Sequence, residues 1–144
     1  MAHHILFLCT GNSARSQMAE ALLPFIGGRD FQAESAGTHP AGLHPMTVMV
    51  MDELGVDIRG RRSKNVAEFR GRSFDYVITV CSQAKETCPV FPGSHTALHW
   101  SFDDPAAASP DRRLEEFRRV RDEIADRIRT FLAVEFKPVP ADPR

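Results

Sequence analysis

A cysteine and an arginine lie close together near the start of the chain, separated by five small or polar residues. The stretch from Cys9 to Arg15 reads CTGNSAR. If it connects a strand to a helix, its backbone can curl so that successive N–H groups point inward at the positive end of the helix dipole. Arg15 can then bind two oxygens of a tetrahedral oxyanion with its planar guanidinium. The predicted oxyanion-binding loop consists of Thr10, Gly11, Asn12, Ser13, Ala14, Arg15 and Ser16.

Cys9 is the candidate nucleophile of this loop. It would lie beneath the central atom of the anion, with Ser16 and Asn12 available to hydrogen-bond the sulfur or to hold the loop in shape. Such surroundings favour the thiolate form of a cysteine. The alternative is a small buried Cys9 and a surface Arg15 with no chemistry between them. The complete string LCTGNSARSQMAE, placed after an apolar run and before an apolar-periodic segment, favours the functional interpretation.

Three further residues could take part in chemistry with Cys9. Cys81 follows the apolar run Phe74–Val80, Cys88 precedes Pro89, and Asp104 lies in an Asp-Asp-Pro turn. Taken alone, each has an ordinary explanation, because cysteines often fill cores and such turns often only form loops.

The elements that must position these residues follow from apolar periodicity and turn signals. Strands separated by helices favour an α/β single domain, with a parallel sheet flanked by helices on both faces and ligands beyond the carboxyl ends of the strands. Cys9, Cys81 and Asp104 should therefore converge on one crevice. We expect strands at Ile5–Cys9, Phe31–Ala36, Phe74–Val80 and Thr96–Trp100, and helical segments at Ala14–Ile26, Pro45–Leu54 and Val66–Phe69.

The last helix has the clearest pattern, because one apolar stripe runs along about five turns while charged residues cover the other side. Its members are Leu114, Phe117, Val120, Ile124, Ile128 and Phe131. Residues 1–136 are expected to form the single domain, and residues 137–144, which include three prolines, a flexible tail. The basic residues of the next stretch are expected to form a solvated face, with a role in substrate binding as the alternative. They are Arg59, Arg61, Arg62 and Lys64.

Composition excludes several classes of protein. With a formal net charge of -1 over 144 residues, the chain has no diffuse basic surface for nucleic acid or anionic lipid. No apolar run approaches the ~20 residues of a membrane span, and no secretory leader precedes the first strand. Three cysteines in such a chain indicate free or redox-cycling thiols in a reducing cytoplasm. His3 and His4 are given no role.

The loop CTGNSARS followed by QMAEALL resembles the low-molecular-weight protein tyrosine phosphatase superfamily, and within it the thioredoxin-coupled arsenate reductases. The resemblance covers most of residues 5–132 and implies a four-stranded parallel sheet flanked by helices. It also includes Glu34–Gly37, Val80–Ser82, Cys88–Pro89, His99–Trp100, Phe102–Pro105 and Phe117–Ile124.

This resemblance implies reduction of arsenate to arsenite without a bound cofactor or metal. Cys9 attacks arsenate while Asp104 supplies a proton, Cys81 then attacks Cys9 and releases arsenite, and Cys88 attacks Cys81. The resulting Cys81–Cys88 disulfide is returned to thiols by thioredoxin. The resemblance also matches Asn12, Glu20 and Ser35 to a potassium site of some arsenate reductases.

Two departures from the family pattern matter. Ala14 stands where many members have a second cysteine, which the relay does not need. Lys64 stands at the fourth position of the potassium site, so its ammonium is expected to take the place of the cation.

Two other functions stay open at this point. A phosphatase would use only Cys9, Arg15 and Asp104, although Ala106 and the alanines after it offer no aromatic ring to a phosphotyrosine. A non-catalytic module could bind phosphate or report redox state through a reversible Cys81–Cys88 bond.

Overall fold

The computed structural model describes residues 2–82, 90–93 and 95–136. Its four strands form one parallel sheet in the order β2-β1-β3-β4. The strands are β1 (His3–Cys9), β2 (Phe31–Gly37), β3 (Tyr76–Thr79) and β4 (Thr96–His99). The helices are α1 (Arg15–Gly27), α2 (Pro45–Asp52) and α3 (Arg113–Glu135), with short 3-10 helices η1 (Val66–Phe69) and η2 (Pro105–Ala107).

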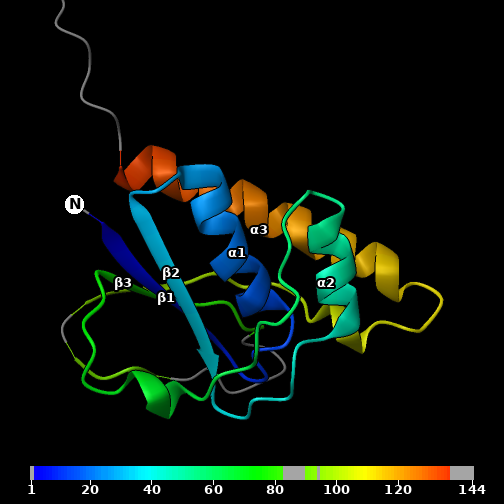
Figure 1. Ribbon diagram of the computed structural model, residues 1–144, viewed down its shortest axis with the longest axis horizontal. Helices are drawn as coiled ribbons and strands as arrows, with labels where there is room; N and C mark the ends of the chain where they lie inside the picture. The colour runs from blue at the N-terminus through cyan, green and yellow to red at the C-terminus, as the bar shows by residue number, and fades with distance from the viewer. Residues whose placement is uncertain (1, 83–89, 94, 137–144) are drawn as a thin grey trace, which may run out of the picture.

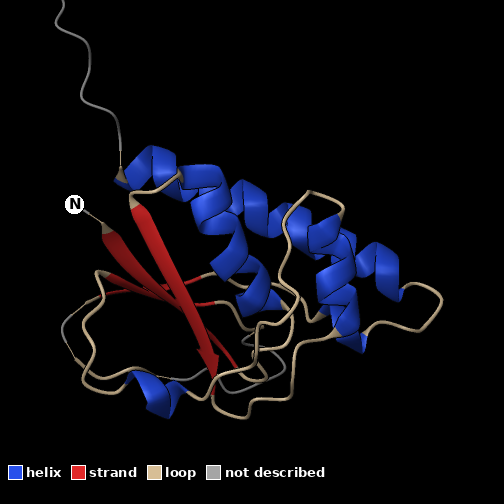
Figure 2. Cartoon of the chain, viewed as in Figure 1, coloured by secondary structure: helices blue, strands red, loops and turns tan. Residues whose placement is uncertain are grey.

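Helical segments cover both faces of the sheet, as the sequence predicts. The helices α1, α2 and α3 lie on one face, and η1 lies on the other (Figure 1; Figure 2). Every described strand pairing is parallel, so the carboxyl ends of the strands share one edge of the sheet. The α/β class and the parallel sheet are thereby confirmed.

The central strand β1 is buried on both faces because its apolar residues occupy both sides of the pleat. Ile5, Phe7 and Cys9 belong to the core under the α-helices, whereas Leu6 and Leu8 belong to the smaller core on the other face. The strand ends at Cys9, which places this thiol at the helix-covered side of the carboxyl edge.

The stripe predicted for the last helix is the core-facing side of α3. Phe117, Val120, Ile124 and Ile128 are completely buried in the core shared with α1 and the sheet. Phe131 packs edge-to-face against Trp100, with the two ring centroids 5.5 Å apart.

The third and fourth strands are shorter than the apolar runs predict. The ring of Phe74 lies outside β3 and contacts Phe69 and Phe91, with centroids 6.1 and 5.8 Å away. The backbone N–H of Trp100 still donates to the Thr79 carbonyl at 2.8 Å, but the indole side chain packs against α3. Tertiary packing, and not strand pairing, therefore accounts for the apolar residues at these ends.

Within the part of the chain that the structure describes, no helix is both long enough and apolar enough to span a bilayer. The predicted tail, 137–144, lies outside the described residues.

Candidate active site

The predicted loop forms a pocket at the carboxyl edge of the sheet. Cys9 ends β1, Arg15 begins α1, and the loop between them curves around a cavity of about 330 Å³. Asp104 reaches the same cavity from the segment before η2. The cavity is lined by Cys9, Thr10, Gly11, Ser13, Ala14, Arg15, His39, Ala41 and Asp104.

The loop carbonyls are bonded to donors from segments outside the loop. Because a trans peptide holds its C=O and the following N–H on opposite sides, an outward carbonyl leaves the next N–H facing inward. Asn12 shows the result, since its N–H lies 3.2 Å from the Cys9 Sγ. The four pairs are the carbonyl of Thr10 with His39 N (2.9 Å), of Gly11 with Ala41 N (2.9 Å), of Asn12 with Ser63 Oγ (2.7 Å) and of Ser13 with Thr47 Oγ1 (2.8 Å).

The Cys9 sulfur has two hydrogen-bond donors within reach. One is the Asn12 N–H, and the other is the Ser16 hydroxyl, whose Oγ lies 2.8 Å from Sγ. The Ser16 Oγ already accepts a hydrogen bond from the Asn12 side-chain amide at 2.8 Å, so its own proton is available to the sulfur. Two donors directed at one sulfur suit a thiolate, which accepts and does not donate.

Asn12 adopts the left-handed backbone conformation, with φ of 49°, and its buried side chain connects the loop to a charged cluster. Its amide donates to the Ser35 Oγ at 2.9 Å, and Ser35 donates to the Glu20 Oε1 at 2.8 Å. The Lys64 Nζ lies 2.8 Å from the same Glu20 oxygen. A continuous chain of polar contacts thus runs from Lys64 to the sulfur of Cys9.

The expectation that Arg59–Lys64 is a solvated face is wrong for part of the stretch. Lys64 and Arg61 each lie 2.8 Å from one carboxylate oxygen of Glu20, whose side chain is only 8% exposed. Glu20 is on α1, so the cations pair with a helix more than 40 residues earlier in the chain. A buried carboxylate needs such partners, since an unpaired buried charge is costly.

Gly37 allows β2 to pass close to the loop. A Cβ at this position would lie 2.4 Å from the Thr10 carbonyl oxygen and 3.0 Å from the Asn12 nitrogen. Both contacts are to backbone atoms that are themselves hydrogen-bonded, so a larger residue would have to move the strand or the loop.

Arg15 and Asp104 line the pocket from two different segments, the start of α1 and the residue before η2. Arg15 is 5% exposed, and its Nη1 donates to the Phe102 carbonyl at 3.2 Å, which ties α1 to the segment that carries Asp104. The Asp104 carboxylate accepts the Ala106 N–H at 3.0 Å and so caps η2. Asp103 instead forms an ion pair with Arg119 on α3, at 3.1 Å.

Cys81 lies two residues after the end of β3, the strand that pairs with β1. The Val80 N–H donates to the Leu8 carbonyl at 2.9 Å, and the Cys81 Sγ lies 3.9 Å from that same oxygen. Cys9 and Cys81 are both buried. Cys88 lies outside the described residues, so its predicted place beside Cys81 remains a prediction.

His44 caps α2 with a neutral imidazole. Its Nδ1 accepts the Met46 N–H at 3.1 Å, while its ring packs on Phe117 with centroids 4.7 Å apart. Burial, and secondarily the nearby Arg113 charge, lowers the pKa of His44 below its ordinary value, although Asp104 opposes this shift. Protonation would remove the lone pair that caps the helix.

Acidification is therefore expected to destabilise the protein through His44. Because its folded-state pKa is depressed, the unfolded chain takes up the proton first, and stability falls as the pH drops below the ordinary pKa of histidine. His44→Asn keeps a capping acceptor that does not titrate. From about pH 7.5 to about pH 5, the Tm of His44→Asn should fall less than that of the parent. Parallel Tm curves for the two proteins would contradict this prediction.

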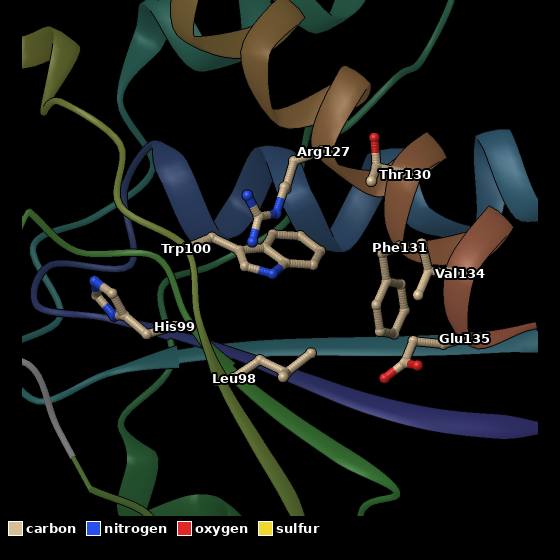
Figure 3. A pocket seen from close by; sticks show the side chains of 8 residues that line it. All are labelled: Leu98, His99, Trp100, Arg127, Thr130, Phe131, Val134 and Glu135. Carbon is tan, nitrogen blue, oxygen red and sulfur yellow. The ribbon is translucent and has the colours of Figure 1, made fainter.

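A second pocket, of about 300 Å³, lies between β4 and α3 (Figure 3). Arg127 of α3 lies over the Trp100 ring there, 5.6 Å from its centroid. Its lining holds no cysteine and no residue of the loop, so the pocket at Cys9 is the candidate active site. The lining residues are Leu98, His99, Trp100, Arg127, Thr130, Phe131, Val134 and Glu135.

Among the described residues, no group of three or more His, Cys, Asp or Glu side chains could hold a metal ion.

The residues that support the loop from outside are absent from the sequence predictions. Thr47 and Ser63 donate to loop carbonyls, and Gln17 donates to the Asn12 carbonyl at 3.3 Å and to its side-chain oxygen at 3.1 Å. Nothing in the sequence marks Thr47 or Ser63, because their role depends on contacts across 34 and 51 residues. Gln17 follows the motif directly, and this position was the available signal in the sequence.

The fold and this pocket define a class: parallel α/β proteins in which a pocket-lining loop joins a cysteine at the end of a strand to an arginine at the start of a helix. The chain belongs to the low molecular weight phosphotyrosine protein phosphatase family, whose sequence pattern matches residues 4–139.

Similar proteins include several with the name arsenate reductase. The arsenate reductase of Halalkalibacterium halodurans is 43% identical over 129 residues, covering 88% of this chain and 93% of that protein. The crystal structure of arsenate reductase from Archaeoglobus fulgidus is 30% identical, with a TM-score of 0.77 over 90% of this chain and 98% of that one. A thioredoxin-dependent arsenate reductase of Corynebacterium glutamicum is 31% identical, with a TM-score of 0.62 over 90% of this chain and 63% of that one.

Proposed function

We propose that this protein reduces arsenate to arsenite, using Cys9 as nucleophile and a disulfide relay through Cys81 and Cys88. The observation that carries the proposal is the position of the second thiol. Cys9 ends β1, and Cys81 lies two residues after the neighbouring parallel strand β3. The Cys81 Sγ lies 3.9 Å from the carbonyl of Leu8, the residue before Cys9. A phosphatase needs one thiol at this edge of the sheet, whereas a reductase needs a second one close by.

In the first step, arsenate binds in the pocket with its oxygens toward the inward N–H groups and the Arg15 guanidinium. The Cys9 thiolate attacks arsenic and an oxygen leaves as water, with a proton from Asp104 acting as general acid. The Asp104 carboxyl lines the pocket together with the Cys9 thiol, which supports this role. Arsenic remains As(V) in the resulting thioester.

In the second step, the Cys81 thiolate attacks the Cys9 sulfur. The S–As electron pair passes to arsenic, so arsenite leaves as As(III) and a Cys9–Cys81 disulfide forms. Cys88 then attacks the Cys81 sulfur, which frees the Cys9 thiol and leaves a Cys81–Cys88 disulfide. A reduced thioredoxin supplies the two electrons that restore both thiols, in a reducing compartment such as the cytoplasm.

The decisive experiment combines the purified protein with arsenate, thioredoxin, thioredoxin reductase and NADPH, and follows NADPH consumption. Arsenate-dependent oxidation of NADPH is the expected result. If instead the protein hydrolyses a phenyl phosphate rapidly and consumes no NADPH with arsenate, the phosphatase alternative holds. The described lining of the pocket favours a small inorganic anion, because it contains no phenyl or indole ring to stack on a phosphotyrosine.

Potassium is expected to have no specific effect on turnover. The Lys64 ammonium lies 2.8 Å from Glu20, which also accepts from Ser35, so a cation already occupies this cluster. Replacing sodium with potassium at equal ionic strength should leave the steady-state rate unchanged. Severalfold activation by potassium would show that the lysine does not stand in for the ion.

The same cluster should matter for stability. Lys64→Met leaves the 8% exposed Glu20 with Arg61 as its remaining cation and is expected to lower the free energy of unfolding by about 1–3 kcal/mol, measurable by urea denaturation. Arg62→Met is the matched control, because Arg62 forms its ion pair with Glu68 at the exposed surface. This control should cost little, since exposed pairs contribute little.

A further inference from the structure

The Ser13 carbonyl is held by two groups from the first turn of α2. The Thr47 hydroxyl donates to it at 2.8 Å and the His44 N–H at 3.1 Å. Thr47 is completely buried, and the proposed reaction scheme gives it no part. Its hydroxyl therefore serves a purpose that neither solvent nor catalysis explains.

The cap of α2 does not need this hydroxyl. The His44 Nδ1 already accepts the Met46 N–H, and the Thr47 N–H bonds the His44 carbonyl at 3.0 Å. The first turn of the helix is thus satisfied by His44 alone. The Thr47 hydroxyl is left to bond a group outside its own helix, and that group is a carbonyl of the oxyanion-binding loop.

We infer that Thr47 is a positioning residue for oxyanion binding, which acts through the Ser13–Ala14 peptide. With the Ser13 carbonyl fixed on α2, peptide planarity turns the Ala14 N–H toward the pocket, where it can donate to an anion oxygen. The Gly11–Asn12 peptide follows the same rule, because its carbonyl bonds Ala41 at 2.9 Å and its N–H points at the Cys9 sulfur. This inference rests on the binding half of the proposed function and not on its redox half.

The position of the Ala14 N–H makes it important for the anion. Ala14 precedes α1 and lines the pocket with Arg15, so its N–H belongs to the positive end of the helix. Without the Thr47 hydroxyl, one of the two bonds that fix this peptide is lost, and rotation of the peptide would aim the carbonyl dipole toward the anion. The expected consequence is weaker anion binding at an unchanged fold.

The test compares Thr47→Val with Thr47→Ser. Valine keeps the shape of the side chain without the hydroxyl, whereas serine keeps the hydroxyl without the methyl group. Binding of inorganic phosphate, measured by calorimetry, should weaken about 3- to 10-fold in Thr47→Val, which corresponds to one lost hydrogen bond. Thr47→Ser should bind phosphate like the parent. In the proposed reaction, Thr47→Val should raise the KM for arsenate by a similar factor with kcat little changed.

The inference would be overturned if Thr47→Val binds phosphate as well as the parent does. It would also be overturned if Thr47→Ser loses as much affinity for phosphate as Thr47→Val, or if the loss of activity in Thr47→Val is confined to kcat. Thermal denaturation establishes that each variant is folded. If Thr47→Val does not fold, Thr47→Ala replaces it in the comparison with Thr47→Ser. Because phosphate binding needs no electron transfer, the outcome is independent of whether the protein reduces arsenate.

Discussion

Replacing Cys9 with serine is expected to abolish arsenate-dependent NADPH oxidation, with a loss of about four orders of magnitude or more. A serine hydroxyl is a weak nucleophile at neutral pH, and its oxygen cannot form the disulfide that provides the two electrons. The N–H groups of the loop and the Arg15 guanidinium remain in this variant. Phosphate should therefore still bind, which calorimetry can measure.

The binding measurement also serves as the control for folding. Loss of both turnover and phosphate binding would indicate a collapsed loop. The role of Cys9 would then be tested with Cys9→Ala in the same two assays. Measurable steady-state turnover by a folded Cys9→Ser protein would contradict the proposed nucleophile.

Replacing Cys88 with serine is expected to limit the protein to one arsenite per chain. The Cys9 and Cys81 thiols still supply the two electrons for one reduction, but the Cys9–Cys81 disulfide then has no third thiol to attack it. Cys88 lies outside the described residues, so this experiment is also the direct test of its predicted place in the relay. The measurement is the amount of arsenite released per chain, first without thioredoxin, where the parent and the variant should each release one, and then with thioredoxin, thioredoxin reductase and NADPH, where only the parent should continue.

Cys81→Ser is the matched control for this prediction. It should release no arsenite under the same conditions, because nothing attacks the Cys9 sulfur to break the S–As bond. The two variants together distinguish the order of the relay. Full steady-state turnover of Cys88→Ser with thioredoxin would remove Cys88 from the mechanism.

The segment that carries β1, the loop and α1 could be predicted because its signals are local. An apolar run, a glycine-containing turn and an apolar-periodic helix follow one another within the first 27 residues, and the structure places β1 at His3–Cys9 and α1 at Arg15–Gly27. The apolar stripe of α3 could be predicted for the same reason, since 3.6-residue periodicity is visible in any long amphipathic helix.

Contacts between distant segments could not be predicted. The ion pair between Arg61 and Glu20 shows this, because Arg61 lies in a stretch whose composition alone indicates a solvated face. Thr47 likewise has the sequence context of an ordinary first helical turn, and only the fold brings its hydroxyl to Ser13. The resemblance supplied Asn12, Ser35 and Lys64 as neighbours of Glu20, but not the support of the loop by α2.

Because its carbonyls are bonded to neighbouring segments, the loop has its final shape before any anion enters. Ordering of the loop is completed during folding, so binding carries little further entropic penalty. A pocket whose shape is already fixed accepts tetrahedral oxyanions of similar size and charge alike, so phosphate and arsenate should compete for it. In a cell rich in phosphate, the working rate of this protein would then follow the ratio of the two anions, and not the concentration of arsenate alone.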